Sequence, residues 1–179
     1  MKIHKECQVE KVASKDASRP SIAHPYLQGG KLIATNGIAM VQIPVEERGE
    51  HDVDGWVTGE ALKAARKAAS RQTSCEISAN GSLALLDGQS FLRPNESTVK
   101  GKWPNCGQVW EPCWAREIKF TVSLSAEQLM DIAKAMGTEG VTLEITGETD
   151  PIRILPCSTR ARTVPVPEAK AILMPIRVR

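Results

Sequence analysis

The sequence predicts an α+β fold built from two consecutive units, each running strand, helix and then about three strands. Two amphipathic segments with helix-start signals, near residues 58–70 and 125–136, supply the helices. Short alternating apolar runs, separated by turn-forming dipeptides such as Asn-Gly, supply the strands. Because this order occurs over residues 56–112 and again over 118–179, we expect the second unit to repeat the first in structure.

The composition is that of a soluble globular protein. The chain has 179 residues, 41% of them hydrophobic and 25% charged, and this length can bury a core without metal or disulfide staples. No run approaches the roughly 20 apolar residues of a membrane-spanning helix, and the N-terminal residues lack the apolar core of a signal peptide. We therefore expect a cytoplasmic protein that does not contact a membrane.

Cysteine and histidine spacing indicates neither a metal site nor a disulfide framework. The five cysteines are odd in number and form no Cys-x-x-Cys pair, and the three histidines share no helical or strand spacing. We expect reduced thiols that pack as small apolar groups, and no cofactor. The net charge is only +2, so any binding of nucleic acid must depend on how the charge is distributed.

The first part of the chain predicts irregular structure followed by a hairpin. Residues 1–31 are polar, with prolines that favour extended conformations, and indicate irregular or edge-strand structure. Residues 31–45 alternate loosely between apolar and polar, and the Asn36-Gly37 dipeptide interrupts them. This dipeptide readily adopts positive φ angles, which predicts a β-hairpin centred on it. A charged loop follows over residues 46–55.

The first helix is predicted to begin after Thr58, which can cap it. Glu60 lies in the first turn, where the helix dipole favours an anion, and residues 61–71 contain no proline, glycine or β-branched residue. Small apolar residues form one face. Four basic residues lie on another face or just beyond it: Lys63, Arg66, Lys67 and Arg71.

Short strands are predicted to complete the first unit, at residues 75–78, 83–86, 90–93 and 98–99. In the second unit, residues 120–124 alternate as a strand, and Ser125 to Gln128 have the form of a capping box. The helix that follows has an apolar stripe and ends at Gly137. Strands are predicted again at residues 141–145, 152–155 and 170–178.

Three separated segments carry a resemblance to a known family: Leu32 to Gly37, Gly101 to Asn105 with the segment 109–112, and Ile172 to Val178. In this order they resemble landmarks of the bacterial DNA polymerase III beta subunit, the replicative sliding clamp. The resemblance covers roughly residues 18–179 and implies a short, divergent form of the DNA-clamp (processivity) fold, with helices packed on antiparallel sheet. It divides the chain into residues 1–113, with the hairpin, and residues 114–179, similar to the C-terminal part of the clamp.

The resemblance also implies a surface pocket that receives short, partly apolar peptides of polymerases and other clamp-binding proteins. Carried over by position, its residues are Thr35, Gly37, Met40, Pro112, Met174, Pro175, Ile176 and Arg177. Asn36, Ile38, Ala39 and Met40 stand where the family has Asp, His, Arg and Leu, so the rim is more apolar and offers fewer hydrogen-bond donors. The alternative is that Gly37 is only a turn glycine and that Met174-Pro175 only ends an edge strand.

In clamps, helices line a channel, and their basic side chains contact DNA phosphates without recognising sequence. The resemblance implies this role for Lys63, Arg66, Lys67 and Arg71, with Arg19 or Lys134 as additions. A solvated basic face is the alternative. The second helix, which exposes Glu127 and Asp131, is not basic.

These features predict a DNA sliding-clamp-like tethering protein of replication or repair, acting as a homo-oligomer on double-stranded DNA. The alternative is a clamp-fold interaction module that binds clamp-binding peptides and modulates the replisome without encircling DNA. An enzyme is the weakest interpretation, because no nucleophile with a neighbouring base and no phosphate-binding glycine loop occurs. The chain is much shorter than a clamp subunit, so a ring would need about six copies if each supplies two units. So small a form suits a phage or mobile element.

Overall fold

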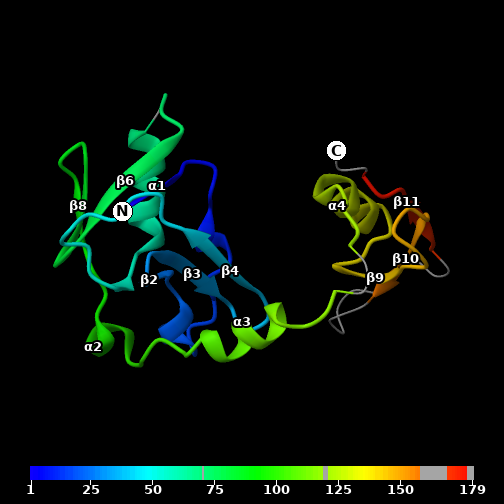
Figure 1. The fold of residues 1–179 in the computed structure, drawn as a ribbon, viewed down its shortest axis with the longest axis horizontal. Coiled ribbons are helices and arrows are strands. Elements are labelled where there is room, and N and C mark those ends of the chain that lie inside the picture. The colour runs from blue at the N-terminus through cyan, green and yellow to red at the C-terminus, as the bar shows by residue number, and fades with distance from the viewer. Residues whose placement is uncertain (70, 119–120, 158–168, 177–179) are drawn as a thin grey trace. The chain divides into compact units, whose positions relative to one another are not determined.

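The computed structural model describes residues 1–69, 71–118, 121–157 and 169–176 (Figure 1). The chain divides into unit 1, Met1–Val109, and unit 2, Trp110–Arg179. The division between these units lies within helix α3, Gly107–Trp114, and the domain boundary expected after residue 113 stays a prediction. Both units combine helices with antiparallel strands, which confirms the predicted α+β class.

One sheet of unit 1 has the strand order β1-β6-β7-β8. Its strands are β1 Lys2–His4, β6 Ser74–Ala79, β7 Ser82–Leu85 and β8 Ser90–Leu92. All neighbours are antiparallel, with Ile3 opposite Cys75 and Ser78 opposite Ala84. From Cys75 onward β6 alternates between buried and exposed side chains, as expected for a strand with one face on the core.

The second sheet of unit 1 contains the predicted hairpin. Its order is β4-β3-β2-β5, with β2 Tyr26–Gln28, β3 Lys31–Thr35, β4 Met40–Pro44 and β5 Gly55–Trp56. Strands β3 and β4 pair from Lys31 opposite Pro44 to Thr35 opposite Met40, so Asn36 to Ala39 form the connection. The expected hairpin is confirmed. Two short 3-10 turns, η1 Val9–Lys11 and η2 Pro20–Ile22, lie in the segment between β1 and β2.

Helix α1, Gly59–Ala68, joins the two sheets through one core. Thr58 caps it as predicted, since its hydroxyl oxygen accepts a hydrogen bond from the Ala61 amide at 3.2 Å. Its buried side chains are Ala61, Leu62 and Ala65. They belong to a cluster that also holds fully buried residues of both sheets: Ile3, Leu27, Leu32, Ile77 and Leu83.

Two helices of this part of the chain differ from the prediction. Residues 98–99 were expected to be a strand but belong to α2, Glu96–Val99. The reason is a reciprocal cap, in which the Asn95 side chain accepts from the Thr98 amide at 2.9 Å and the Thr98 hydroxyl accepts from the Asn95 amide at 2.8 Å. Helix α3 was not predicted, because Pro112 within it lacks a backbone N–H and usually interrupts helices.

The segment between α2 and α3 is anchored by aromatic side chains. Trp103 stacks on Tyr26 with ring centroids 5.0 Å apart and planes 11° apart, and Tyr26 meets Trp56 edge to face at 5.2 Å. Arg93, at the end of β8, donates hydrogen bonds to the carbonyls of Trp56, Ala79, Asn80 and Val53. These contacts hold Arg93 and Trp103 against the strands of unit 1.

Unit 2 packs helix α4, Ala126–Ala135, against the sheet β11-β10-β9. The strands are β9 Gly140–Glu144, β10 Ile152–Cys157 and β11 Ala171–Leu173. The Ser125 hydroxyl caps the helix, and Gly137, with φ +63°, follows its end, as predicted. The buried core residues of this unit are Met136, Ile152, Ile154 and Leu173.

The first strand predicted for unit 2 is not formed in the described part. Residues 121–125 have no strand, and Phe120 lies outside the described residues. Instead, the Ile176 amide donates a backbone hydrogen bond to the Ser123 carbonyl at 2.8 Å. The last strand ends at Leu173 rather than at residue 178, and residues 177–179 lie outside the described range.

Candidate functional site

A cavity of about 580 Å³ lies in unit 1 beside the β3–β4 turn. It is lined from three segments of the chain, within residues 18–22, 35–40 and 100–109. Thr35, Gly37 and Met40, three of the expected peptide-binding residues, are among those that line it. The aromatic anchor at Trp103 holds the third segment in place.

The β3–β4 turn is held by its own polar side chains. The Thr35 hydroxyl donates to the Ala39 carbonyl at 2.8 Å and accepts from the Gly37 amide at 3.1 Å. The Asn36 side-chain oxygen accepts from the amides of Ile38 and Ala39. Gly37 has φ +87°, a conformation that favours glycine. These hydrogen bonds hold the turn in one conformation, and Thr35, which also lines the cavity, takes part in two of them.

Apolar side chains dominate the wall of the cavity. Ile38 is 95% exposed and Val109 is 68% exposed, so both can bury area against a bound molecule. Met40 and Pro104 extend this surface. Burial raises the pKa of the Cys106 thiol, which therefore lines the cavity as a neutral group. Such a wall suits aliphatic or aromatic side chains of a peptide.

Among the described residues, two cations also line the cavity, Arg19 and Lys100. Sequence reasoning named Arg19 only as an addition to a DNA surface and did not name Lys100. Both lie far along the chain from the hairpin, and Lys100 follows a helix that was predicted as a strand. No sequence motif within residues 98–105 indicated that Lys100 would line this cavity.

The C-terminal residues of the expected pocket line another cavity, in unit 2. Met174, Pro175 and Ile176 border a space of about 470 Å³ together with Ser123 and Glu148, among others. Met174 is 59% exposed and Ile176 is 48% exposed. Arg177 lies outside the described residues. Pro112 is exposed, inside α3. The single pocket expected from the resemblance draws on residues of both units and stays a prediction.

The basic residues of α1 separate into two groups. Lys63, Lys67 and Arg71 are exposed, and none of them forms an ion pair with any other described residue. Arg66 instead pairs with Glu10, whose side chain is only 8% exposed, and its Nη1 also donates to the Cys7 carbonyl at 3.2 Å. Arg66 thus stabilises unit 1 itself, and only the other three remain available to a phosphate.

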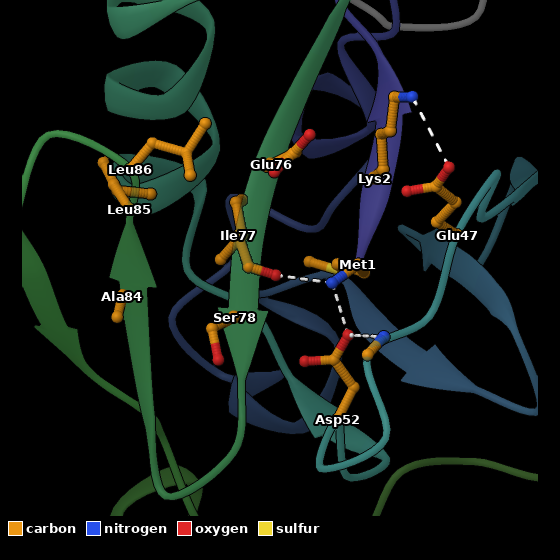
Figure 2. Close-up of a pocket in the computed structure, with 11 residues that line it drawn as sticks. Met1, Lys2, Glu47, Asp52, Glu76, Ile77, Ser78, Ala84, Leu85 and Leu86 are labelled. Atoms are coloured by element: carbon orange, nitrogen blue, oxygen red, sulfur yellow. Dashed lines mark hydrogen bonds and ion pairs between the residues drawn. The ribbon is translucent and has the colours of Figure 1, made fainter.

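A further cavity, of about 310 Å³, surrounds the Met1 amino group (Figure 2). The Met1 ammonium is paired with the buried Asp52 carboxylate and donates to the Ile77 carbonyl at 2.7 Å. Lys2 in turn lies 3.7 Å from Glu47. These charged groups already form ion pairs with one another. We therefore assign them a role in stabilising unit 1 and not in binding a ligand.

The described residues hold neither a metal-binding cluster nor a helix that could cross a membrane. Among residues 1–69, 71–118, 121–157 and 169–176, no group of three or more His, Cys, Asp or Glu side chains is arranged to hold a metal ion. No helix in those ranges combines the length and the apolar composition needed to cross a membrane.

Two α+β units with helices on antiparallel sheet define a clamp-like fold, and solved structures share it. The beta sliding clamp of C. crescentus, crystallised with polyethylene glycol at a region described as tethering a beta motif, superposes with a TM-score of 0.64. Two structures of the DNA polymerase sliding clamp from Pseudomonas aeruginosa give TM-scores of 0.59 and 0.53. Identity is 14% in each case, so the likeness concerns the fold.

The match includes 98% of this chain but only 50% of each of these clamp chains. The protein thus spans about half the length of the clamps it resembles. No model of a protein family matches the sequence, and no curated protein matches it.

Proposed function

We propose that the protein is a non-enzymatic, clamp-like tethering factor of DNA replication or repair in the cytoplasm. It binds short, partly apolar peptides of a DNA polymerase or of other clamp-binding proteins. It also holds double-stranded DNA without sequence preference, as a homo-oligomer. No cofactor takes part in this function.

The observation that carries the proposal is the cavity of about 580 Å³ at the β3–β4 turn. It combines a hydrogen-bonded turn with exposed apolar side chains, which is the chemistry that receives a peptide in an apolar groove. In one solved clamp of the same fold, a bound polymer occupies a region described as tethering. We also propose peptide contacts for Met174, Pro175, Ile176, Arg177 and Pro112.

The proposed DNA surface consists of Lys63, Lys67 and Arg71, which are exposed on or just after α1. Three cations without ion pairs in the described part of the chain can contact phosphates directly. We leave Arg66 out of this surface because Glu10 holds its guanidinium.

A second candidate function is a clamp-fold interaction module that binds peptides but does not encircle DNA. The pairing of Arg66 with Glu10 favours it, because it removes one of four expected DNA contacts. The exposed carboxylates Glu127 and Asp131 on α4 favour it as well, since they repel phosphates.

The experiment that tests the proposal measures binding of a fluorescein-labelled clamp-binding peptide from a bacterial replicative polymerase by fluorescence anisotropy. We expect a dissociation constant in the micromolar range, because each buried aliphatic side chain contributes about 1.5 to 3 kcal/mol before ordering costs. Ile38→Lys should abolish binding. The matched control is Met130→Lys, since Met130 is 58% exposed on α4 and does not line this cavity.

The peptide test can also fail clearly. Equal binding by the wild type and by the Ile38→Lys variant would place the peptide elsewhere. No binding at millimolar peptide, by a protein with native circular dichroism, would reject the tethering function. Met174→Lys then asks whether unit 2 contributes, because we expect that change to weaken binding as well.

A further inference from the structure

We infer that the cavity at the β3–β4 turn selects peptide segments carrying aspartate or glutamate side chains, and that Arg19 and Lys100 are the residues that select them. This inference rests on the proposed function, because it names the chemistry of the peptide bound at the same cavity. It concerns two residues that do not belong to the set expected from the resemblance.

The residues that line the cavity carry positive charge. Arg19 and Lys100 are the charged residues among the described side chains that line the cavity, and no aspartate or glutamate lies among them. A concave surface with charge of one sign and apolar walls concentrates the opposite charge. The cavity is therefore complementary to an anion that is attached to apolar groups.

Lys100 is available to such an anion. It ends α2 in a left-handed conformation with φ +53°, and its backbone amide is bonded to the Glu96 carbonyl. The backbone of this residue is thus held in one conformation, while its side chain is exposed and has no ion pair in the described part of the chain. Its ammonium group can therefore bind a carboxylate without breaking an ion pair in the described part of the chain.

Arg19 faces the turn directly. Its Nη1 lies 3.5 Å from the Asn36 carbonyl oxygen and 2.7 Å from the position that a side chain on Gly37 would occupy. Its Nε is 3.7 Å from a carboxylate oxygen of Asp16, and both side chains are more than half exposed. Such a solvated ion pair is weak. Guanidinium has five N–H donors, so Arg19 can bind an incoming carboxylate while it keeps its contact with the turn.

The occupant that fits is an extended segment of a partner protein in which acidic side chains alternate with aliphatic or aromatic ones. The two cations come from separate segments of the chain, at the start of η2 and at the end of α2. Each of these two cations can bind one carboxylate, so the lining suits a peptide that carries more than one acidic side chain.

The test compares two fluorescein-labelled peptides of leucine, phenylalanine and aspartate, or of leucine, phenylalanine and asparagine at the same positions. Both are amidated at the C-terminus, and binding is measured by anisotropy at low and high salt. We expect the aspartate peptide to bind about fivefold more tightly at low salt. This preference should disappear in the R19Q/K100Q variant and at high salt. The K102Q variant, which changes an exposed cation outside the lining, should keep it.

Each outcome of the peptide experiment supports or contradicts the inference. If both peptides bind equally to the wild type, the inference is wrong while the proposed function stands. If neither binds at millimolar concentration, the proposed function fails and the inference fails with it. An asparagine peptide with a free C-terminus that binds as tightly as the aspartate peptide would overturn the assignment to side-chain carboxylates. Loss of the preference in K102Q would assign it to general surface charge. Circular dichroism of each variant verifies that it is folded.

Discussion

Asp52 is a buried carboxylate on which several elements of unit 1 converge. It accepts hydrogen bonds from the Met1 ammonium, the Ala79 amide at 2.6 Å and the Gly49 amide at 2.9 Å. Burial raises the pKa of Asp52, but these hydrogen bonds outweigh burial, and the pKa lies below its ordinary value. The ionised carboxylate therefore stabilises the folded state (Figure 2).

We expect Asp52→Asn to lower the free energy of unfolding at pH 7 by about 1 to 3 kcal/mol, because buried donors lose a charged acceptor. Since the folded-state pKa is depressed, the wild type has this stabilisation above pH ~3.9 and loses it as the pH falls through the lower, native value. Denaturant unfolding from pH 7 to pH 3 should show the two proteins converging. A constant difference across that range would contradict the prediction, and Asp87→Asn, at an exposed site, is the control.

Gly37 combines a turn conformation with a place in the cavity wall. Gly37→Ala should cost about 1 to 2 kcal/mol of stability, because an alanine side chain disfavours φ +87°. It should also weaken peptide binding, since its Cβ would lie 2.7 Å from Arg19 Nη1 and displace that side chain. Chemical denaturation and peptide anisotropy measure the two effects separately.

Gly88 offers a matched comparison for Gly37. It has φ +83°, and a side chain there would meet nothing within 4 Å. Gly88→Ala should therefore show a similar loss of stability and unchanged peptide affinity. If both variants lose affinity equally, the loss at Gly37 reflects the stability of unit 1 and not the geometry of the cavity.

At the scale of the element, α1 carries two separate sets of side chains. Its small apolar residues pack on β6 and β7, and Arg66 ties it to η1 through Glu10. Lys63 and Lys67 are exposed to solvent. The helix is thus fixed in unit 1 by one set of residues, while another set stays free for an external anion.

Substitutions in α1 should separate the effects of these two sets. Lys63→Ala/Lys67→Ala should leave stability within about 0.5 kcal/mol of the wild type. It should also flatten the salt dependence of DNA binding by roughly one phosphate contact per residue. Arg66→Ala should instead destabilise the protein by about 1 to 3 kcal/mol, because it leaves the Glu10 carboxylate unpaired. Filter binding over a range of salt concentrations, with thermal unfolding in parallel, measures both. Identical salt slopes for the wild type and the lysine variant would reject the DNA surface.

At the scale of the whole molecule, the proposed ring depends on how many copies of the protein assemble. It spans half of each solved clamp chain, so a ring of clamp dimensions takes more copies of this protein than of a full-length clamp. The proposed ring therefore requires oligomer formation. A monomer would support the interaction module instead.

We expect native mass spectrometry to give a defined multiple of the 19.5 kDa chain mass. Protein loaded on closed circular DNA should be retained at moderate salt and released when the circle is linearised, because a ring can slide off an end. Release at the same rate from circular and linear DNA, or a monomer at every concentration, would contradict the ring.

Local sequence rules predicted most of the elements. Helices α1 and α4 were found because a hydroxyl cap and an apolar stripe lie within the helix or next to it, as at Thr58 and Ser125. The β3–β4 hairpin followed from Asn36-Gly37. Helices α2 and α3 were missed. In α2 the cap depends on an unusual Asn95–Thr98 pair, and in α3 a proline lies within the helix.

The residues that line the cavity were predicted only in part, because some of them come from segments that lie far apart in the sequence. Thr35, Gly37 and Met40 lie within six consecutive residues, so a local sequence motif is enough to identify them. The pairing of Arg66 with Glu10, and the meeting of Arg19 and Lys100 at one cavity, join segments far apart in the chain. Periodicity tells which face of a helix a side chain occupies, but the partner opposite that face depends on how distant segments pack. The sequence alone therefore predicted the clamp-like units and their turn. The positive charge that lines the cavity and the ion pair between Arg66 and Glu10 depend on contacts between distant segments, so only the tertiary structure revealed them.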